Sequence, residues 1–317
     1  MISIVIPTKN NGDIIERCLV SIRKQNYPSD DIEIIIVDGH SHDNTVDIAK
    51  KHGCIIKYEE HGTISYARNL GIKAAKGQIV AFTDADCVVD TNWIKEAVKL
   101  FTDPAIAAVG GPNITPDDDS NFARNVGAVL SFLSRAGARY GYEGKEVEEI
   151  YHNPTCNVFY QKKVLLEVGG FNQNLVTVDD EELDYRIRKN SYKILYTPFS
   201  KVYHYRRPSW KRFMKMAYTY GLGRMQAIKI HPDMGKTFHY MPSIMFIAII
   251  GLYLLSILNC ITMWIPNVLV TVFVIGIFVF SVHLSIHNRE NSVLTAFGLM
   301  ITWILLWGAG FIRGVTK

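Results

Sequence analysis

The stretch ISIVIPTKN, from Ile2 to Asn10, opens the chain with a run rich in β-branched residues. A short apolar run that ends at Pro and Asn predicts a buried β-strand. Asp13 and Glu16 follow with the spacing of a capping box, which predicts the start of a helix. The inward face of this helix is expected to carry Ile15, Cys18, Leu19 and Ile22. The first unit of the fold is therefore one strand followed by one amphipathic helix.

Strands and helices continue to alternate over the next residues. Apolar strands are predicted at IEIIIVDG (32–39), IIKYEE (55–60) and QIVAFTDAD (78–86). Helices are predicted between them, from Asp43 to Gly53 and from Thr63 to Ala75. Repeated strand–helix units predict an α/β fold with a mostly parallel sheet and helices on both faces. Later elements are expected as helices at 92–101, 121–138 and 179–189 and strands at 105–110 and 192–198.

Hydropathy divides the 317-residue chain into two parts. There is no Lys, Arg, Asp or Glu from Thr237 to Asn288, and none from Asn291 to Ile312. A helix needs about 20 apolar residues to cross a bilayer. We therefore expect a globular domain over 1–206, basic amphipathic interfacial helices over 207–241 and a transmembrane region over 242–317. The expected spans are 243–264, 267–287 and 292–312.

The chain has a basic segment just before the apolar region, with thirteen Lys or Arg and one acid between Arg186 and Lys236. Its position favours contact with anionic lipid or a lipid-linked phosphate over a simple solvated face. From Ser209 to Ile230, one helical face carries Trp210, Phe213, Met214 and Ala217. This pattern predicts a helix in the membrane interface, with packing on the globular domain as the alternative.

The N-terminal run follows Met1 directly and has no basic leader, so we expect the globular domain to stay on the cytoplasmic side of the cell membrane. A multi-pass membrane protein is the predicted class. Five cysteines without CxxC spacing favour reduced thiols over a disulfide frame or a zinc site. A channel or transporter is disfavoured because the three expected spans contain no Lys, Arg, Asp or Glu.

Polar residues concentrate where the predicted strands end, which is where ligands bind in an open parallel sheet. They are Pro7, Thr8, Asn10, Asp38, Asp84 and Asp86. On a strand, residues two apart point to the same side, so Asp84 and Asp86 are expected to face one ligand. Mg²⁺ or Mn²⁺ bound to such a pair often takes its other ligands from substrate phosphates, and this suggests a nucleoside diphosphate. The alternative for a lone DxD is a solvated loop or a helix cap.

Two other phosphate-binding motifs are absent from the sequence. PTKNNG stands after the first strand where a dinucleotide-binding fold would have GxGxxG, and the chain has no GxxxxGK[ST]. Nicotinamide-dependent chemistry and P-loop phosphotransfer are therefore disfavoured.

These motifs stand in the order found in family 2 glycosyltransferases of the GT-A fold, and the chain resembles that family over about residues 2–206. The segments that carry the resemblance are ISIVIPTKNN, IIIVDGHSHDNT, ARNLGIKAAKG, FTDADC, CNVFYQKKVLLEVGGF, DDEELDYRIRKN and VYHYR. It implies a Rossmann-like GT-A domain that acts as an inverting, metal-dependent hexosyltransferase. It also implies that the nucleotide is held by Pro7, Thr8, Asn10, Asp38, Arg68 and Asp84, and that the metal is held by Asp86, Asp84 and His204.

The DDEELDYR segment carries the expected catalytic acids. The family pattern places the catalytic base at Asp180, with Glu182 supporting the acceptor pocket. An acceptor hydroxyl that attacks an anomeric carbon must lose its proton, and a carboxylate within hydrogen-bond reach can accept it. The alternative is a set of acids that only complements the helix N-terminus.

The acceptor side is assigned to Asn157, Asp179, Arg206, Arg207 and Trp210. For the last three, anchoring of the membrane-side helix is the favoured alternative to a clamp on the diphosphate or on a polyprenyl phosphate. A single histidine such as His204 is also often structural, so a core role stays open for it.

We therefore expect transfer of a sugar from a UDP- or GDP-sugar to a membrane-held, lipid-linked acceptor. The expected partners are this nucleotide sugar, the acceptor and membrane lipids, and no nucleic acid is expected. A polyprenyl-phosphate sugar synthase is a close alternative, since a phosphate oxygen needs no strong base. A membrane scaffold that has lost activity is a second alternative.

Overall fold

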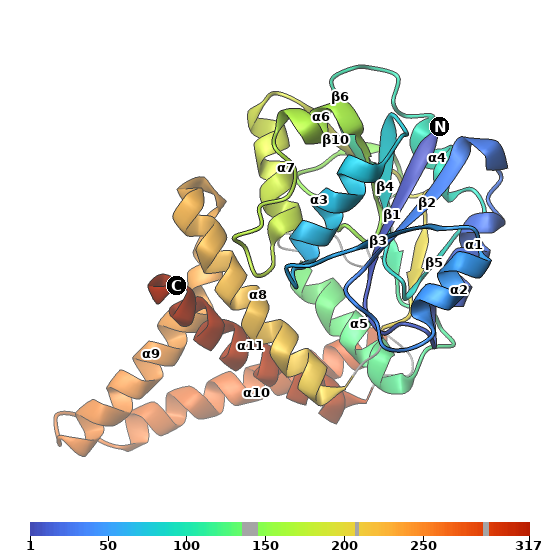
Figure 1. Ribbon diagram of the computed structural model, residues 1–317. Helices are drawn as coiled ribbons and strands as arrows, with labels where there is room; N and C mark the ends of the chain where they lie inside the picture. The colour runs from blue at the N-terminus through green and yellow to red at the C-terminus, as the bar shows by residue number, and fades with distance from the viewer. Residues whose placement is uncertain (135–144, 207–208, 288–291) are drawn as a thin grey trace. The chain divides into compact units, whose positions relative to one another are not determined.

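The computed structural model describes residues 1–134, 145–206, 209–287 and 292–317 (Figure 1). The chain forms two compact units. The globular unit contains Met1–Asp119, Leu130–Asn174 and Asp179–Arg207. The helical unit contains Ser120–Val129, Leu175–Val178 and Pro208–Lys317.

The globular unit is built on a sheet of eight strands in the order β3-β2-β1-β4-β9-β6-β10-β8. Their bounds are β1 Ile2–Thr8, β2 Ile32–Asp38, β3 Ile55–Tyr58, β4 Ile79–Phe82, β6 Ile106–Gly110, β8 Glu148–Glu149, β9 Val158–Gln161 and β10 Lys193–Tyr196. Strands β1 to β4 pair in parallel, as do β6 and β10. The predicted mostly parallel α/β fold is confirmed. Strand β9, which runs antiparallel between β4 and β6, is not among the strands predicted from the sequence.

The globular unit also contains a second sheet of three strands, in the order β5-β11-β7. It consists of β5 Cys87–Val89, β7 Asn113–Ile114 and β11 Val202–His204. The antiparallel pairing of β11 with β5 sets His204 directly opposite Cys87. This register brings residues more than a hundred positions apart in sequence to one point.

Helices cover both faces of the large sheet (Figure 1). They are α1 Ile15–Arg23, α2 Thr45–Lys51, α3 Ile64–Ala74, α4 Trp93–Val98, α6 Lys162–Glu167 and α7 Asp179–Lys189. Successive side chains of a strand point to opposite faces. Ile4 and Ile6 of β1 therefore join one core with α1 and α4, whereas Val5 joins the other with α3. Each of these fully buried side chains contributes roughly 1.5–3 kcal/mol of hydrophobic stabilisation.

The predicted capping box at the first helix is wrong. Helix α1 begins at Ile15, and its N-cap, Ile14, makes no side-chain cap hydrogen bond. The chain turns at Asn11 instead, whose carbonyl accepts from the backbone N–H groups of both Ile14 and Ile15. The inward face is nevertheless as predicted, with Ile15, Cys18, Leu19 and Ile22 all buried.

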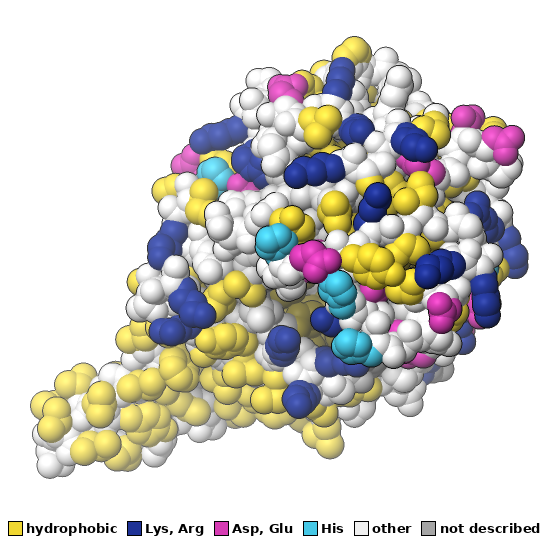
Figure 2. All heavy atoms as spheres, in the orientation of Figure 1, with side chains coloured by type: hydrophobic (Ala, Val, Ile, Leu, Met, Phe, Trp, Pro, Cys, Tyr) yellow, Lys and Arg dark blue, Asp and Glu magenta, His cyan; other side chains and the backbone are white. Residues whose placement is uncertain are grey.

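The helical unit contains α8 Trp210–Ile230, α9 Thr237–Ile257, α10 Trp264–His287 and α11 Val293–Thr316, together with the first part of α5 Asn121–Ser134. Three of these helices, α9, α10 and α11, are long and apolar enough to cross a membrane. The visible surface of α9 and α10 carries many hydrophobic side chains (Figure 2). The three spans expected from hydropathy thus correspond to three helices.

Helix α8 packs against α11 at backbone contact distance. A Cβ atom added to Gly221 would lie 1.9 Å from the carbonyl oxygen of Trp307, and one added to Gly310 would lie 2.0 Å from that of Tyr218. Small residues at such crossings let two helices approach closely. On the predicted apolar face of α8, Phe213 and Ala217 are buried, whereas Trp210 and Met214 are exposed. The placement of this helix in the membrane interface stays a prediction.

Candidate active site

The predicted nucleotide residues of the first two strands lie together at the carboxyl edge of the sheet. Thr8 of β1 is in register with Asp38 of β2. The Asp38 carboxylate accepts from the backbone N–H and the hydroxyl of Ser41, at 2.8 and 2.5 Å. Asn10, whose φ is 53°, donates its backbone N–H to the same Ser41 hydroxyl at 2.8 Å. Pro7 precedes this group on β1, next to Val37 of β2.

The predicted metal residues converge at one point. Ligand atoms of Asp84, Asp86, Cys87 and His204 all lie within 4.8 Å of one another. The predicted reason for the Asp84–Asp86 pairing is wrong, because β4 ends at Phe82 and the two acids lie in the following turn, not on a strand. That turn is closed by a hydrogen bond from the Cys87 N–H to the Asp84 carbonyl at 3.1 Å.

The charges of this cluster are poorly balanced without a cation. Burial, together with the charges of Cys156 and Asp86, raises the pKa of Asp84 to about 7. Burial alone would lower the pKa of His204, but the Asp86 carboxylate, 3.1 Å from its Nε2 atom, raises that pKa to about 10. The two carboxylates and the imidazole form a donor set that suits a divalent ion such as Mn²⁺, whereas the Cys87 thiol, whose pKa is raised by burial, is a poor ligand for such a hard ion. These residues therefore fit a metal site.

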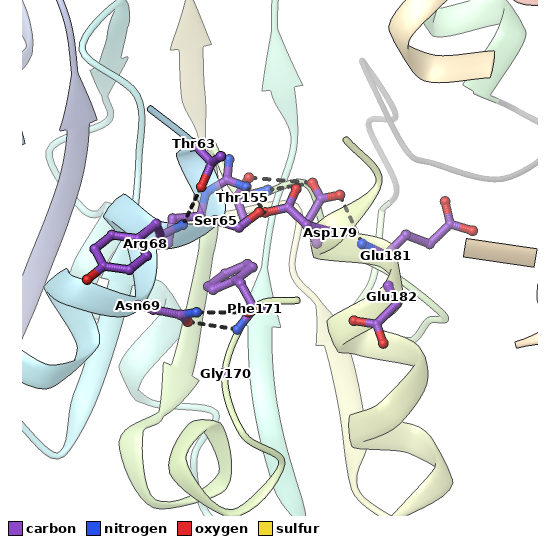
Figure 3. Close-up of polar contacts among 12 residues, drawn as sticks. Thr63, Ser65, Arg68, Asn69, Thr155, Gly170, Phe171, Asp179, Glu181 and Glu182 are labelled. Carbon is purple, nitrogen blue, oxygen red and sulfur yellow. Dashed lines mark hydrogen bonds and ion pairs between the residues drawn. The ribbon is translucent and has the colours of Figure 1, made fainter. Parts of the chain in front are cut away.

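Arg68 connects this cluster to the acids of α7. Its guanidinium donates to Asp179 at 2.7 Å, and Ser65 donates to the same carboxylate oxygen at 2.8 Å. Figure 3 shows Ser65 and Arg68 from α3 and Asp179 from α7 pointing toward one another. Burial opposes the charge of Arg68, but Asp179, Asp180 and Asp84 all act on it and raise its pKa. Arg68 thus lies within electrostatic reach of both acidic groups.

A glycine turn holds the other side of Arg68. Gly169 and Gly170 have φ values of 84° and 70°, which are strained for other residues. Phe171 follows this turn. Its backbone N–H donates to the Asn69 side chain and its carbonyl accepts from it, each at 2.8 Å (Figure 3). Its ring lies 5.3 Å from the Arg68 guanidinium, in cation–π contact. The GGF segment therefore helps to position the Arg68 guanidinium through the ring of Phe171.

Four acids of α7, Asp179, Asp180, Glu182 and Asp184, differ in exposure. The side chains of Asp179, Glu182 and Asp184 are exposed by only 4%, 1% and 0%, and each is bonded to a basic group. That of Asp180 is exposed by 19%. Its carboxylate accepts from the Glu181 N–H at 2.9 Å and lies 3.4 Å from the N–H and hydroxyl of Thr155. Of these four, Asp180 is the acid best placed to meet a substrate.

The loop before β9 joins the two acidic groups. Thr155 contacts Asp180, and the next residue, Cys156, lies beside Cys87 and His204, which lower the pKa of its thiol. Adjacent Cα atoms are about 3.8 Å apart. The metal cluster and Asp180 consequently belong to one site.

The other predicted acceptor and catalytic residues are engaged elsewhere in the structure. Glu182 forms a two-pronged ion pair with Arg186, at 2.8 Å for each bond, and points away from Asp179 (Figure 3). Asn157 is fully buried, where it accepts from the Trp93 indole and donates to the carbonyls of Pro112 and Ser200. Asp179 is likewise committed to Arg68. These contacts indicate structural roles, and acceptor or catalytic roles for the three residues stay predictions.

The predicted basic residues after β11 are placed in different ways. The backbone N–H of Arg206 donates to the Asp119 carboxylate, and its guanidinium donates to the Thr115 hydroxyl. The charge of Arg206 also acts on Cys156 and His204. Trp210 belongs to the helical unit, where its ring packs edge-on against Phe122 at 5.3 Å. Arg207 lies outside the described residues.

Several residues of this site were not predicted from the sequence. Cys87 directly follows the DxD pair and could have been found by that position. Ser65, Thr155 and His152 gave no signal, because each joins the site through contacts with residues far away in the sequence.

Comparison with known proteins identifies the class that this fold and site define. Residues 3–169 match the family model described as glycosyl transferase family 2. The chain belongs to that family and is a hexosyltransferase of the GT-A fold, which confirms the resemblance seen in the sequence.

Full-length similarity extends through the apolar helices. A dolichyl N-acetyl-α-D-glucosaminyl phosphate 3-β-D-2,3-diacetamido-2,3-dideoxy-β-D-glucuronosyltransferase of Methanococcus voltae is 26% identical over 100% of this chain and 97% of its own length. Glycosyltransferase AglE of Haloferax volcanii is 26% identical over 71% of this chain and 73% of its own. Among solved structures, the mannosyltransferase PcManGT of Pyrobaculum calidifontis, in complex with GDP-Man and Mn²⁺, has a TM-score of 0.67. It is 18% identical, with 99% of this chain and 86% of that one covered.

Proposed function

We propose that this protein transfers a sugar from a nucleotide diphosphate sugar to a lipid-linked acceptor held in the membrane, with inversion at the anomeric carbon. The observation that carries the proposal is the joining of two acidic groups by consecutive residues: Thr155 contacts Asp180, and Cys156 lies beside the cluster of Asp84, Asp86 and His204. A displacement reaction needs a leaving group that is held in place and a base that accepts a proton. One acidic group can hold the leaving group through a metal ion, and the other can supply the base.

The donor side uses the carboxyl edge of the sheet. Thr8, Asn10 and Asp38 would bind the base and ribose, and the N–H groups of Arg68 that Asp179 leaves free would bind the diphosphate. Asp84, Asp86 and His204 would hold a divalent cation. Such a cation, when bound, stabilises the negative charge that develops on the departing diphosphate.

The acceptor side uses Asp180. In the proposed reaction the acceptor hydroxyl oxygen forms a bond to the anomeric carbon, and the bond from that carbon to the diphosphate oxygen breaks. The bonding electron pair leaves with the diphosphate, and the hydroxyl proton moves to the Asp180 carboxylate. The partly exposed position of Asp180 beside its buried neighbours supports this assignment.

A lipid-linked acceptor is supported by two features. The Methanococcus voltae relative is named for a dolichyl-phosphate-linked sugar substrate, and its match covers the whole chain. The three apolar helices would keep the site near such a lipid. The globular unit would face the cytoplasm, where nucleotide sugars are made.

The experiment is a transfer assay with the purified full-length chain in lipid nanodiscs. A panel of UDP- and GDP-sugars is offered with either dolichyl phosphate or a dolichyl-linked sugar, in Mn²⁺, Mg²⁺ or EDTA. Transfer to the lipid-linked sugar, lost in EDTA, is expected. Transfer only to bare dolichyl phosphate would instead identify a polyprenyl-phosphate sugar synthase, and no donor turnover would identify an inactive scaffold.

The Asp180→Asn variant tests the base. We expect transfer to fall by about 10³-fold while nucleotide binding is unchanged, because proton transfer contributes about 10²–10⁴-fold to such reactions. Glu181→Gln, which removes the neighbouring carboxylate, is the matched control and should keep transfer. Full turnover by Asp180→Asn would remove Asp180 from the role of base.

A further inference from the structure

A buried histidine, His152, lies next to the proposed base, Asp180. His152 lies in the loop before β9, and its side chain is 6% exposed. Its Nδ1 atom is 2.9 Å from Asp184 Oδ2, and its Nε2 atom is 3.9 Å from Asp180 Oδ2. Asp180 and Asp184 are one turn apart on α7, so both can face the same ring. The imidazole bridges the proposed base and a second carboxylate.

Asp184 holds this ring in a fixed position. It is completely buried, so it cannot itself reach a substrate. It accepts from the Asn153 N–H at 2.9 Å and from the Tyr160 hydroxyl at 2.8 Å, in addition to His152. Three donors from the loop and β9 fix the carboxylate, and through Nδ1 they fix the plane of the imidazole. The Nε2 edge is thereby aimed at Asp180.

Neighbouring carboxylates favour the protonated form of this ring. Burial opposes its protonation, but the carboxylates of Asp180 and Asp184 raise the pKa of His152 to about 9. The carboxylates of Asp180, Asp184 and Glu181 on α7 act on the ring, and Tyr160 of β9 bonds the same Asp184 carboxylate. Of the nearby cations, Arg188 of α7 donates to the carbonyl of the preceding residue, Tyr151, and Arg68 of α3 acts on Tyr160. The three carboxylates stabilise a positive charge on the ring.

We propose that His152 is a positioning residue for the base, an imidazolium that is anchored by Asp184 and holds the Asp180 carboxylate in place. The proposal rests on the proposed role of Asp180. His152 keeps both of its protons while Asp180 accepts the proton of the acceptor. It contributes by fixing where the receiving oxygen lies when the hydroxyl attacks.

The His152→Asn variant separates charge from structure. The Asn side chain can still donate to Asp184 but carries no positive charge toward Asp180. In full-length protein, with the donor and acceptor that the wild type uses, we expect kcat to fall by about 10²-fold, the cost of misplacing a reacting group by about 1 Å. The KM for the donor and the binding of UDP or GDP with Mg²⁺ should be unchanged. His52→Asn removes a histidine that pairs with Glu16 outside the site, and should keep wild-type kcat.

The pH profile gives a readout that a purely structural role would not move. Wild-type kcat should fall above pH about 9, where His152 loses its proton, and His152→Asn should lack this alkaline fall. In Asp184→Asn the fall should begin at lower pH, because removing a nearby anion lowers the pKa of a cation. This second variant retains the histidine and tests the anchor directly.

Two results would overturn the proposal. One is a His152→Asn enzyme with wild-type kcat and an unchanged pH profile. The other is loss of nucleotide binding in parallel with kcat in both variants, since that would assign His152 to folding alone. Failure of the wild type to transfer with any donor is a different result, and it would reject the proposed function before His152 is tested.

Discussion

The metal side and the base side of the site differ in how their acids are neutralised. On the base side each buried acid of α7 has a resident cation: Asp179 has Arg68, Glu182 has Arg186 and Asp184 has His152. On the metal side two carboxylates, Asp84 and Asp86, share one resident cation, His204, which lies 3.1 Å from Asp86, with a thiol beside them. A side that supplies its own cations needs none from solution, whereas a side with excess negative charge is suited to bind one.

The largest expected effect comes from weakening the metal side. Asp86→Asn should lower transfer by about 10³-fold, since charge stabilisation by a bound cation is worth several kcal/mol. Transfer rates measured over a range of Mn²⁺ concentrations check this, and the loss should persist at saturating metal. Asp103→Asn, on an exposed turn, is the control. An Asp86→Asn enzyme with wild-type turnover would show that the excess charge serves no metal.

The pH dependence of metal binding sharpens the contrast. A bound ion must displace a proton from Asp84, whose pKa is about 7, and from His204, whose pKa is about 10. Affinity must then rise with pH, by about 10²- to 10³-fold between pH 6 and pH 8. Calorimetric titration with Mn²⁺ measures it, and His204→Asn should show a shallower slope. Equal affinity at both pH values would contradict the assignment.

On the base side, breaking one resident ion pair should cost stability. Asp179→Asn leaves the buried Arg68 charge without its partner, and the free energy of unfolding should fall by about 3 kcal/mol. Thermal unfolding of the full-length chain monitors the change. Glu96→Gln, which breaks the exposed pair with Lys99, should shift the midpoint only slightly. Comparable shifts for the two variants would mean that the Arg68 pair is not a structural element of this side.

The smallest effect is expected at Thr155. Replacing it with Val keeps its shape but removes the hydroxyl that lies 3.4 Å from Asp180, and kcat should fall by about threefold to tenfold. Thr155→Ser retains the hydroxyl and should keep most of the activity. Steady-state kinetics of the pair measure this. An equal loss in both variants would point to packing of the methyl group instead.

The alternation of strands and helices was predictable because it depends on local hydrophobic periodicity. Ile2–Thr8 and Ile32–Asp38 are short segments rich in Ile and Val, and such segments identify buried strands of a parallel sheet. The insertion of Val158–Gln161 between β4 and β6 was not predictable, because that order is set by pairing between distant segments. Asp84 and Asp86 were found by their motif, although a turn and not a strand brings them together.

On the base side, the contacts of the individual acids could not be predicted from the sequence. The DDEELD run indicates acids on a helix, but it does not reveal that Asp179 is paired with Arg68 and that Asp180 is the more exposed. Those differences arise from α3 and from the loop before β9, which meet α7 only in the folded chain. No sequence motif surrounds His152, so its position between two carboxylates is visible only in the folded structure.

The central claim is that the metal cluster and Asp180 act on one donor from opposite ends. The most direct measurement is anomalous scattering at the manganese edge from crystals of the full-length chain with Mn²⁺ and an unreactive nucleotide sugar. We predict a manganese peak among Asp84, Asp86 and His204, in contact with the diphosphate, and Asp180 on the far side of the anomeric carbon. A peak at another position, or a donor whose anomeric carbon lies beyond the reach of Asp180, would contradict it.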